Sequence, residues 1–281
     1  DSSMRLMKAA QFLVLCTVPL AALSRVGAGD GRLTPEQRDP RVIMEAVYRA
    51  GAEGSPRAGR LRLRTTPSGG VARERVMQVR YRGDANTRRS LLLVEGPAEV
   101  RGTGFVAIEY PFSDRSSERW LYLANLKRST RIAGGQMSGS FMGSDLSFAD
   151  LSQPDPGRFD FELLKASEQV GQEDCWVIRA RAKDPRTQEE SGYLEVQFWI
   201  SKAKLSMVRM RAPLSNGKAI KYMEGSDFLQ IERYWTPRHL VIRTVEGGQL
   251  RSESVLDTLE LKADPSVSDA DFTKQRLELG P

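Results

Sequence analysis

The sequence predicts a mainly β protein with a few helices, built around one large antiparallel sheet. About eleven segments alternate apolar and polar residues, as half-buried strands do. They follow one another at regular spacing, with hairpin-forming turns such as Asn216-Gly217 and Gly247-Gly248 between them. Helical segments do not alternate with the strands, which indicates an antiparallel sheet rather than βαβ units. A sheet of this size curls into a barrel or splits into two layers.

An amphipathic helix over residues 40–50 is expected before the strands. Asp39 is a typical N-capping residue, Pro40 suits the first turn, and Gly51 suits the position after the last turn. The apolar residues recur at helical spacing and form one stripe. A helix with a single apolar face needs a sheet to lie on.

Two hairpins are expected, one before and one after the stretch from Glu118 to Leu151. Residues 60–64 and 71–82 should pair through a turn at 67–70, and residues 159–167 should pair with 175–182. Further strands are predicted at residues 91–94 and 104–110, with a turn or short helix at 97–101.

The region after Leu194 predicts a meander that ends in a short capped helix at 268–273. One of its turns is expected at Thr236-Pro237. Its strands are residues 194–200, 205–212, 219–223, 228–234, 240–245 and 251–261.

The stretch from Glu118 to Leu151 is the most distinctive part of the chain. It opens with a strand-like WLYL, passes through a basic turn, and ends in a segment that is rich in Gly, Ser and large apolar residues. Gly139 and Gly143 disfavour a long helix there, because each glycine costs about 1 kcal/mol in a helix interior. The segment is too apolar for a free loop, so we expect it to fold over an apolar surface.

The same stretch resembles a known family. The order WLYL, KRSTRI and SFMGSDLSFADL, together with PAEVRGTGF at 97–105 and DADFT at 269–273, resembles the LolA-like outer membrane lipoprotein-sorting proteins. The likeness is greatest to the longer branch associated with RND-type exporters. It implies a half-open antiparallel β-barrel of about eleven strands. It also implies that helices at 40–50 and around 141–151 cover the concave side.

The N-terminal residues 1–28 predict a secretory signal peptide. A short basic region at 4–8 precedes an apolar run at 9–23 and small residues at 26–28. Residues 1–3 read as a cloning scar, residues 29–38 as a linker, and residues 39–281 as a single LolA-like lipid- or lipoprotein-binding domain. A retained membrane anchor fits less well because the run is short and contains Pro19. A lipoprotein leader ending at Cys16 stays open, although Leu15 is not the small residue such leaders carry.

Composition excludes several functions. Loss of the leader removes Arg5, Lys8, Arg25 and Asp1, so the net charge falls from +6 to +4. The basic residues are interspersed with many acidic residues, and the chain lacks the basic run or aromatic platform of a nucleic-acid-binding protein.

Cys16 would leave with the leader, so Cys175 would be the one remaining thiol. We expect Cys175 to be a buried core residue.

Catalytic and metal-binding patterns are weak. The chain has one histidine, His239, and its serines at 138, 140, 144 and 147 lie outside a G-x-S-x-G motif. Asp145 and Asp150 suit helix capping better than acid–base chemistry. We therefore predict no enzyme, no catalytic residues, no metal site and no cofactor.

Lipid-binding residues are expected on the concave wall and on the covering segment. There, burial of acyl chains contributes about 0.8 kcal/mol per methylene and needs no ionic anchor. Each candidate is equally open to a role as an ordinary core residue. The wall candidates are Phe105, Leu121, Leu123, Val196, Phe198, Ile200, Val208 and Met210, and the cover candidates are Phe141, Met142, Leu146 and Phe148.

The function that follows from the resemblance is a periplasmic carrier. It would take lipoprotein acyl chains or free lipids, such as hopanoids or glycolipids, towards the outer membrane, with transient contact to a membrane surface. An alternative is a non-enzymatic accessory subunit of an inner-membrane RND-type lipid exporter, docking through Lys127, Arg128 and Arg131. A lipid-directed enzyme using Ser144, Asp145 or His239 is a third hypothesis.

Overall fold

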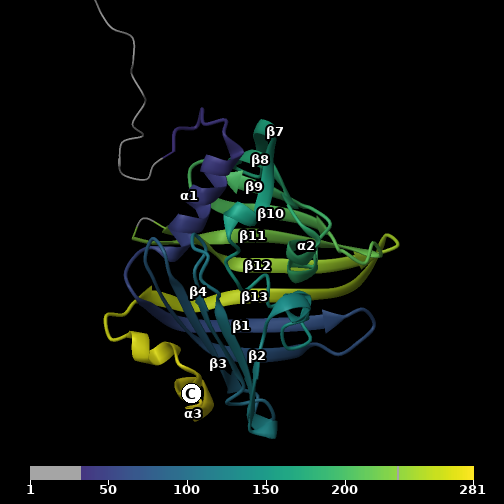
Figure 1. Ribbon diagram of the computed structural model, residues 1–281. Coiled ribbons are helices and arrows are strands. Elements are labelled where there is room, and N and C mark those ends of the chain that lie inside the picture. Colours follow the sequence, from purple (N-terminus) through teal and green to yellow (C-terminus); the bar gives the residue numbers. More distant parts are fainter. Residues whose placement is uncertain (1–32, 233) are drawn as a thin grey trace, which may run out of the picture. The chain divides into compact units, whose positions relative to one another are not determined.

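The computed structural model describes residues 33–232 and 234–281 (Figure 1). The predicted signal peptide and the first part of the predicted linker lie outside the described residues. Within the described part, no helix combines the length and the apolar character needed to cross a membrane.

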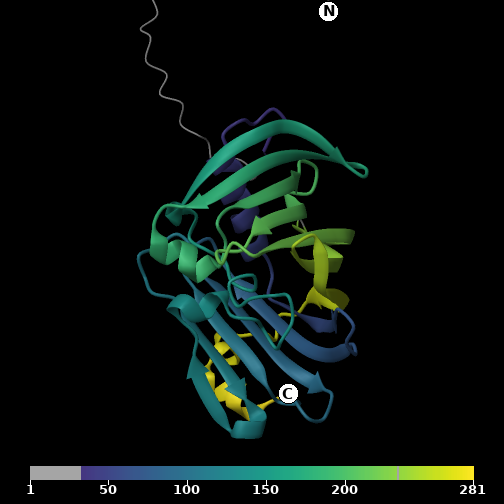
Figure 2. The same ribbon diagram turned by 90° about the vertical axis from the view of Figure 1, so that its right-hand side faces the viewer.

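Thirteen antiparallel strands form one sheet, in the order β6-β5-β4-β3-β2-β1-β13-β12-β11-β10-β9-β8-β7. Its edge strands β6 and β7 are not paired with each other, so the sheet curves without closing (Figure 2). The predicted mainly β, half-open barrel is confirmed, with thirteen strands rather than about eleven. The strands are β1 (Arg57–Pro67), β2 (Arg73–Gly83), β3 (Arg88–Gly96), β4 (Gly104–Glu109), β5 (Glu118–Leu123), β6 (Arg128–Arg131), β7 (Phe159–Val170), β8 (Glu173–Ala182), β9 (Val196–Ser201), β10 (Ser206–Pro213), β11 (Ala219–Ile231), β12 (Tyr234–Glu246) and β13 (Gln249–Ala263).

The topology has two consequences for the middle of the chain. Neighbouring strands follow chain order except at the centre, where β1 pairs with β13. The connection between the edge strands β6 and β7 runs over one face of the sheet, where Phe141, Leu146 and Phe148 are buried. We call this the inner face and the other the outer face.

The predicted turn at Thr236-Pro237 is wrong. Both β11 and β12 continue past it, and Pro237 lies opposite Phe228. The strands accommodate the proline at a local irregularity, where Asp227 has a positive φ of 48°. The hairpin instead reverses after Ile231, next to Glu232 with a φ of 55°.

Helix α1 (Pro40–Ala52) forms where predicted, and Asp39 caps it by accepting hydrogen bonds from the backbone N–H groups of Arg41 and Val42. Ile43 and Met44 pack on the inner face of β8 and β9. The short helices α2 (Pro185–Ser191) and α3 (Lys274–Leu279) were not predicted, whereas the expected helix at 268–273 is a 3₁₀ turn over Asp269–Phe272.

The expected helix around 141–151 is wrong. Residues 139–151, which we call the cover segment, form turns and an isolated antiparallel bridge between Ser140 and Ser147. Met142 and Gly143 have positive φ values of 53° and 71°, and two left-handed residues in succession reverse the chain and prevent a helix.

Both faces of the sheet carry apolar clusters. Leu92 and Val94 of β3 point into the inner cluster, whereas Leu91 and Leu93 lie under α3 and the 3₁₀ turn on the outer face. This is why residues 91–94 form a continuous apolar run rather than an alternating one.

Candidate functional site

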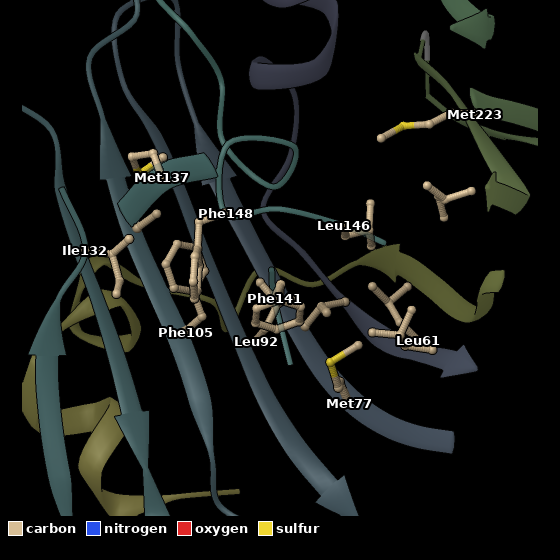
Figure 3. Packing of buried hydrophobic residues seen from close by; sticks show 14 of the residues in the cluster. Leu61, Met77, Leu92, Phe105, Ile132, Met137, Phe141, Leu146, Phe148 and Met223 are labelled. Carbon is tan, nitrogen blue, oxygen red and sulfur yellow. The ribbon is translucent and has the colours of Figure 1, made fainter. Parts of the chain in front are cut away.

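The cover segment fills the inner face of the sheet. Phe141, Leu146 and Phe148 are buried in the inner cluster, and the rings of Phe141 and Phe148 pack on Phe105 of β4 with centroid distances of 6.2 and 5.4 Å (Figure 3). Phe141 and Phe148 also meet edge to face at 5.8 Å. The apolar side chains of the segment thus form the central part of the core.

Asp145 fixes the middle of the cover segment to the sheet. Its buried carboxylate accepts hydrogen bonds from Thr244 Oγ1 at 2.5 Å, from Ser254 Oγ at 2.7 Å and from the Ser252 hydroxyl. Its backbone N–H donates to Ser254 Oγ at 3.0 Å. The expected capping role of Asp145 is therefore replaced by docking onto hydroxyl groups of β12 and β13.

Asp150 fixes the end of the same segment through a buried ion pair. Lys221 Nζ of β11 lies 2.7 Å from Asp150 Oδ2 and 2.9 Å from the hydroxyl of Tyr193, which itself donates to Asp150. Burial, followed by the charge of Asp150, raises the pKa of Tyr193 well above its ordinary value. Asp150 also caps a local turn, because it accepts the backbone N–H of Ser147.

A third polar contact holds the chain just beyond the cover segment. Glu109 of β4 is buried and accepts two hydrogen bonds from Arg119, at 2.8 and 2.9 Å. It also accepts the backbone N–H of Gln153, whose side-chain amide donates to the carbonyl of Tyr48 in α1. The cover segment is thus held by polar contacts at its middle and its end.

A hollow remains between the cover segment and the centre of the sheet. It consists of two adjoining cavities of about 120 and 260 Å³, which share Leu61, Tyr81, Arg88 and Leu256 as lining residues. Phe141, Leu146 and Leu151 line the smaller cavity from the cover side. The larger cavity continues along β1, β12 and β13 towards the hairpin between β11 and β12.

The structure separates the predicted lipid-binding residues into groups. Those in or against the inner cluster are Phe105, Leu121, Phe141, Met142, Leu146, Phe148, Val196, Phe198 and Met210. Of these, Phe141 and Leu146 line the hollow. Leu123 is half-buried at the end of β5, outside the apolar clusters of the described residues.

Two wall candidates lie outside the inner cluster. Ile200 packs under α1 with Trp176. Val208 faces the outer side with Trp199, because a register shift between Met207 and Arg209 changes which residues of β10 face inward. Strict alternation along the sequence could not reveal this shift.

Several residues of the site were missed. Lys221 occupies an inward position between Ala219 and Met223, and a lysine in an otherwise apolar register was the available signal. The lining from Leu61, Met77 and Leu256 depends on β1 meeting β13 at the centre of the sheet, which only the fold reveals.

The residues of the hydrolytic hypothesis do not converge. Ser144 Oγ donates to the carbonyl of Phe141, and Asp145 docks on β12 and β13. His239 Nδ1 lies 2.7 Å from Asp257 and points away from them, because its neighbour Leu240 faces inward. Among the residues that the structure describes, no acidic, histidine and cysteine side chains group as metal ligands.

The same fold occurs in solved structures of bacterial proteins. A domain described as an outer membrane lipoprotein-sorting protein from Vibrio parahaemolyticus gives a TM-score of 0.73 at 23% identity, over 84% of this chain and 97% of that one. A DUF1329 family protein from Desulfovibrio piger gives 0.73 at 23% identity, over 85% and 100%. A LolA superfamily protein from Nitrosomonas europaea gives 0.63 at 18% identity, over 85% and 100%.

A sequence-family comparison agrees with this likeness. Residues 86–279 match the model of a family described as "Uncharacterized protein". The chain belongs to that family, and its fold is LolA-like. No curated protein matches the chain. The fold of this LolA-like chain differs from the sequence-based expectation in the cover segment, which consists of turns and not of a helix.

Proposed function

We propose that this LolA-like chain is a non-enzymatic periplasmic carrier that holds acyl chains of lipoproteins or free lipids in the hollow and moves them towards the outer membrane. One observation carries the proposal. An apolar hollow at the centre of the sheet lies beneath a segment without regular secondary structure, which a few side-chain contacts hold in place. Such a segment can withdraw without breaking the sheet.

The hollow is small for a lipid carrier. Its cavities of about 120 and 260 Å³ together reach only the lower end of the roughly 300–1,000 Å³ of typical ligand sites. Phe141 and Leu146 occupy space that an acyl chain would take. We therefore infer that loading displaces the cover segment and that acyl chains replace its side chains against the same wall.

The energetics allow this exchange. Each methylene that leaves water contributes about 0.8 kcal/mol, so ten methylenes contribute roughly 8 kcal/mol. This gain is of the same order as the burial lost when Phe141, Leu146 and Phe148 leave the core, at roughly 1.5–3 kcal/mol for each side chain. Release then requires only that the segment returns, so loaded and empty states of similar free energy suit a carrier.

Transfer at the inner membrane is the remaining part of the proposal. Lys127, Arg128 and Arg131 are exposed at the edge strand β6 and its preceding turn, where a membrane partner such as an RND-type exporter can dock. Docking at an edge leaves the hollow free for cargo.

The test is the lipid content of protein purified from the periplasm, measured by mass spectrometry of an organic extract. Leu256→Trp places a bulky ring in both cavities, and Leu259→Trp adds the same ring at an exposed position on the same strand. We expect acyl lipid with the parent and with Leu259→Trp, and much less with Leu256→Trp. A parent protein without acyl lipid, or equal lipid in both folded variants, would contradict the proposal.

A further inference from the structure

The larger cavity carries two arginines in its lining. Arg57 of β1 and Arg88 of β3 line the larger cavity, and Tyr81 of β2 lies between them because it pairs with Arg57 across the β1–β2 ladder. Tyr234 and Trp235 line the same cavity, as does Leu240. The name basic end is used below for five residues of this cavity, which are Arg57, Tyr81, Arg88, Tyr234 and Trp235. A largely apolar hollow with two guanidinium groups in its wall matches an amphiphile.

The two arginines are close enough to repel each other. Burial, and then the positive charge of Arg88, lower the pKa of Arg57, although a guanidinium stays protonated in proteins. Arg57 also packs over the ring of Tyr234, with 5.5 Å from the guanidinium carbon to the ring centroid. Glu232 is the nearby acid that acts on Arg57.

Arg88 differs from the arginines on the outer face of the same region. Arg60 pairs with Glu95 at 2.8 Å and Arg62 with Asp257 at 2.8 Å. The side chain of Arg88 is half-buried, and it forms neither a hydrogen bond nor an ion pair with the other described residues. A half-buried cation without an anion is unfavourable unless a ligand supplies the anion.

We propose that the basic end binds the anionic headgroup of a lipid whose acyl chain lies in the hollow. Phosphate or carboxylate oxygens would accept hydrogen bonds from Arg88 and Arg57, since guanidinium groups bind such oxygens in a fork geometry. Tyr234 and Trp235 would contact the region between head and chain, as amphipathic rings do. This inference rests on the proposed function and adds the headgroup class, in contrast to the sequence-based expectation of binding without an ionic anchor.

The test compares two probes with the same chain and different heads. These are 1-myristoyl-lysophosphatidylglycerol, which is anionic, and 1-monomyristoylglycerol, which is neutral, each titrated below its micellar concentration and measured by calorimetry. We expect the full-length parent to bind the anionic probe about tenfold more tightly, the effect of one charge-assisted contact. Higher salt should reduce the preference, because the basic end is only partly buried.

Three variants make the test specific. Arg88→Gln should lose the preference and keep its affinity for the neutral probe, and Arg88→Glu should favour the neutral probe. Arg64→Gln is the matched control, because Arg64 is exposed on β1 and also lacks an ion pair with the described residues. Its preference should stay at the parental value.

The possible failures are distinguishable. If neither probe binds the parent, the carrier function is wrong. If both probes bind with equal affinity, or if Arg88→Gln and Arg88→Glu keep the parental preference, the headgroup assignment is wrong while the carrier function stands. A further outcome is that millimolar inorganic phosphate displaces the anionic probe and leaves the neutral probe bound. That result would show that the two arginines bind a free anion, and it would overturn the assignment to a lipid headgroup.

Discussion

Lys221 Nζ lies 2.7 Å from Asp150 Oδ2, and the two side chains are only 7% and 6% exposed. This ion pair joins strand β11 to the end of the cover segment, and the hydroxyl of Tyr193 completes it. A buried charge is stable only with its partner. The pair therefore ties the position of the cover segment to the electrostatics of the core.

Lys221→Met should destabilise the fold by about 3–5 kcal/mol, because it leaves the Asp150 carboxylate buried without a cation. Adding Asp150→Asn should recover most of the loss. Urea unfolding of the two variants measures this. Arg181→Met is the control, since Arg181 and Glu195 form an exposed pair whose loss should cost less than about 1 kcal/mol. Equal losses for Lys221→Met and Arg181→Met would show that the buried pair does not hold the segment.

Asp145→Ala should loosen the cover segment with a smaller loss of global stability. The change removes an acceptor for hydroxyls of β12 and β13, at a cost of about 1–3 kcal/mol. Hydrogen exchange of residues 139–151 should accelerate, and so should the uptake of cis-parinaric acid followed by stopped-flow fluorescence. Asp155→Ala is the control, because Asp155 caps a 3₁₀ turn outside the segment. Faster exchange in 139–151 with unchanged uptake would mean that cargo does not enter beneath the segment.

Local patterns predicted much of the fold. The helix at 40–50 and the hairpin of residues 60–64 and 71–82 follow from residue spacing and turn residues, which act over a few positions. The cover segment was predicted to lie over an apolar surface, and it does. Its helical conformation was wrong, because Met142 and Gly143 take left-handed conformations that the sequence does not show.

Long-range pairing explains what the sequence could not show. The pairing of β1 with β13 joins residues almost 200 positions apart, as for Arg62 and Asp257, and it places Leu61 and Leu256 at the hollow. The register shift in β10 moves Val208 to the outer face. Arg88 lies outside the strand predicted at 91–94, whereas in the fold it begins β3 and lines the hollow.

Gly59→Ala should disrupt the central pair of strands. A Cβ atom at Gly59 would lie 2.0 Å from the carbonyl oxygen of Glu260 and 2.9 Å from the Cα atom of Leu261, next to a register shift after Arg60. Both contacts are with backbone, so the cost should reach the upper end of the ~1–3 kcal/mol that overpacking causes.

Gly217→Ala is the matched control for Gly59→Ala. Gly217 has a positive φ of 68° in a hairpin turn, and no atom lies within 4 Å of an added Cβ. Its cost should be about 1 kcal/mol, from backbone strain alone. Thermal unfolding distinguishes the two variants, and equal melting temperatures would show that β1 and β13 separate easily at this point.

Cys175 should make the fold sensitive to alkaline pH. Burial raises the pKa of its thiol to about 11, from an ordinary value of 9.0. Stability from this group is complete below pH 9 and is lost as the pH rises towards 11, because only the unfolded chain releases the proton. At pH 10.5 the loss should be about 2 kcal/mol relative to pH 8. Urea unfolding at pH 8 and at pH 10.5 measures this loss of unfolding free energy. The loss should be about 2 kcal/mol smaller for Cys175→Ala than for the parent. Buried tyrosines affect both proteins alike. Identical losses in the two proteins would mean that the thiol titrates normally in the folded state.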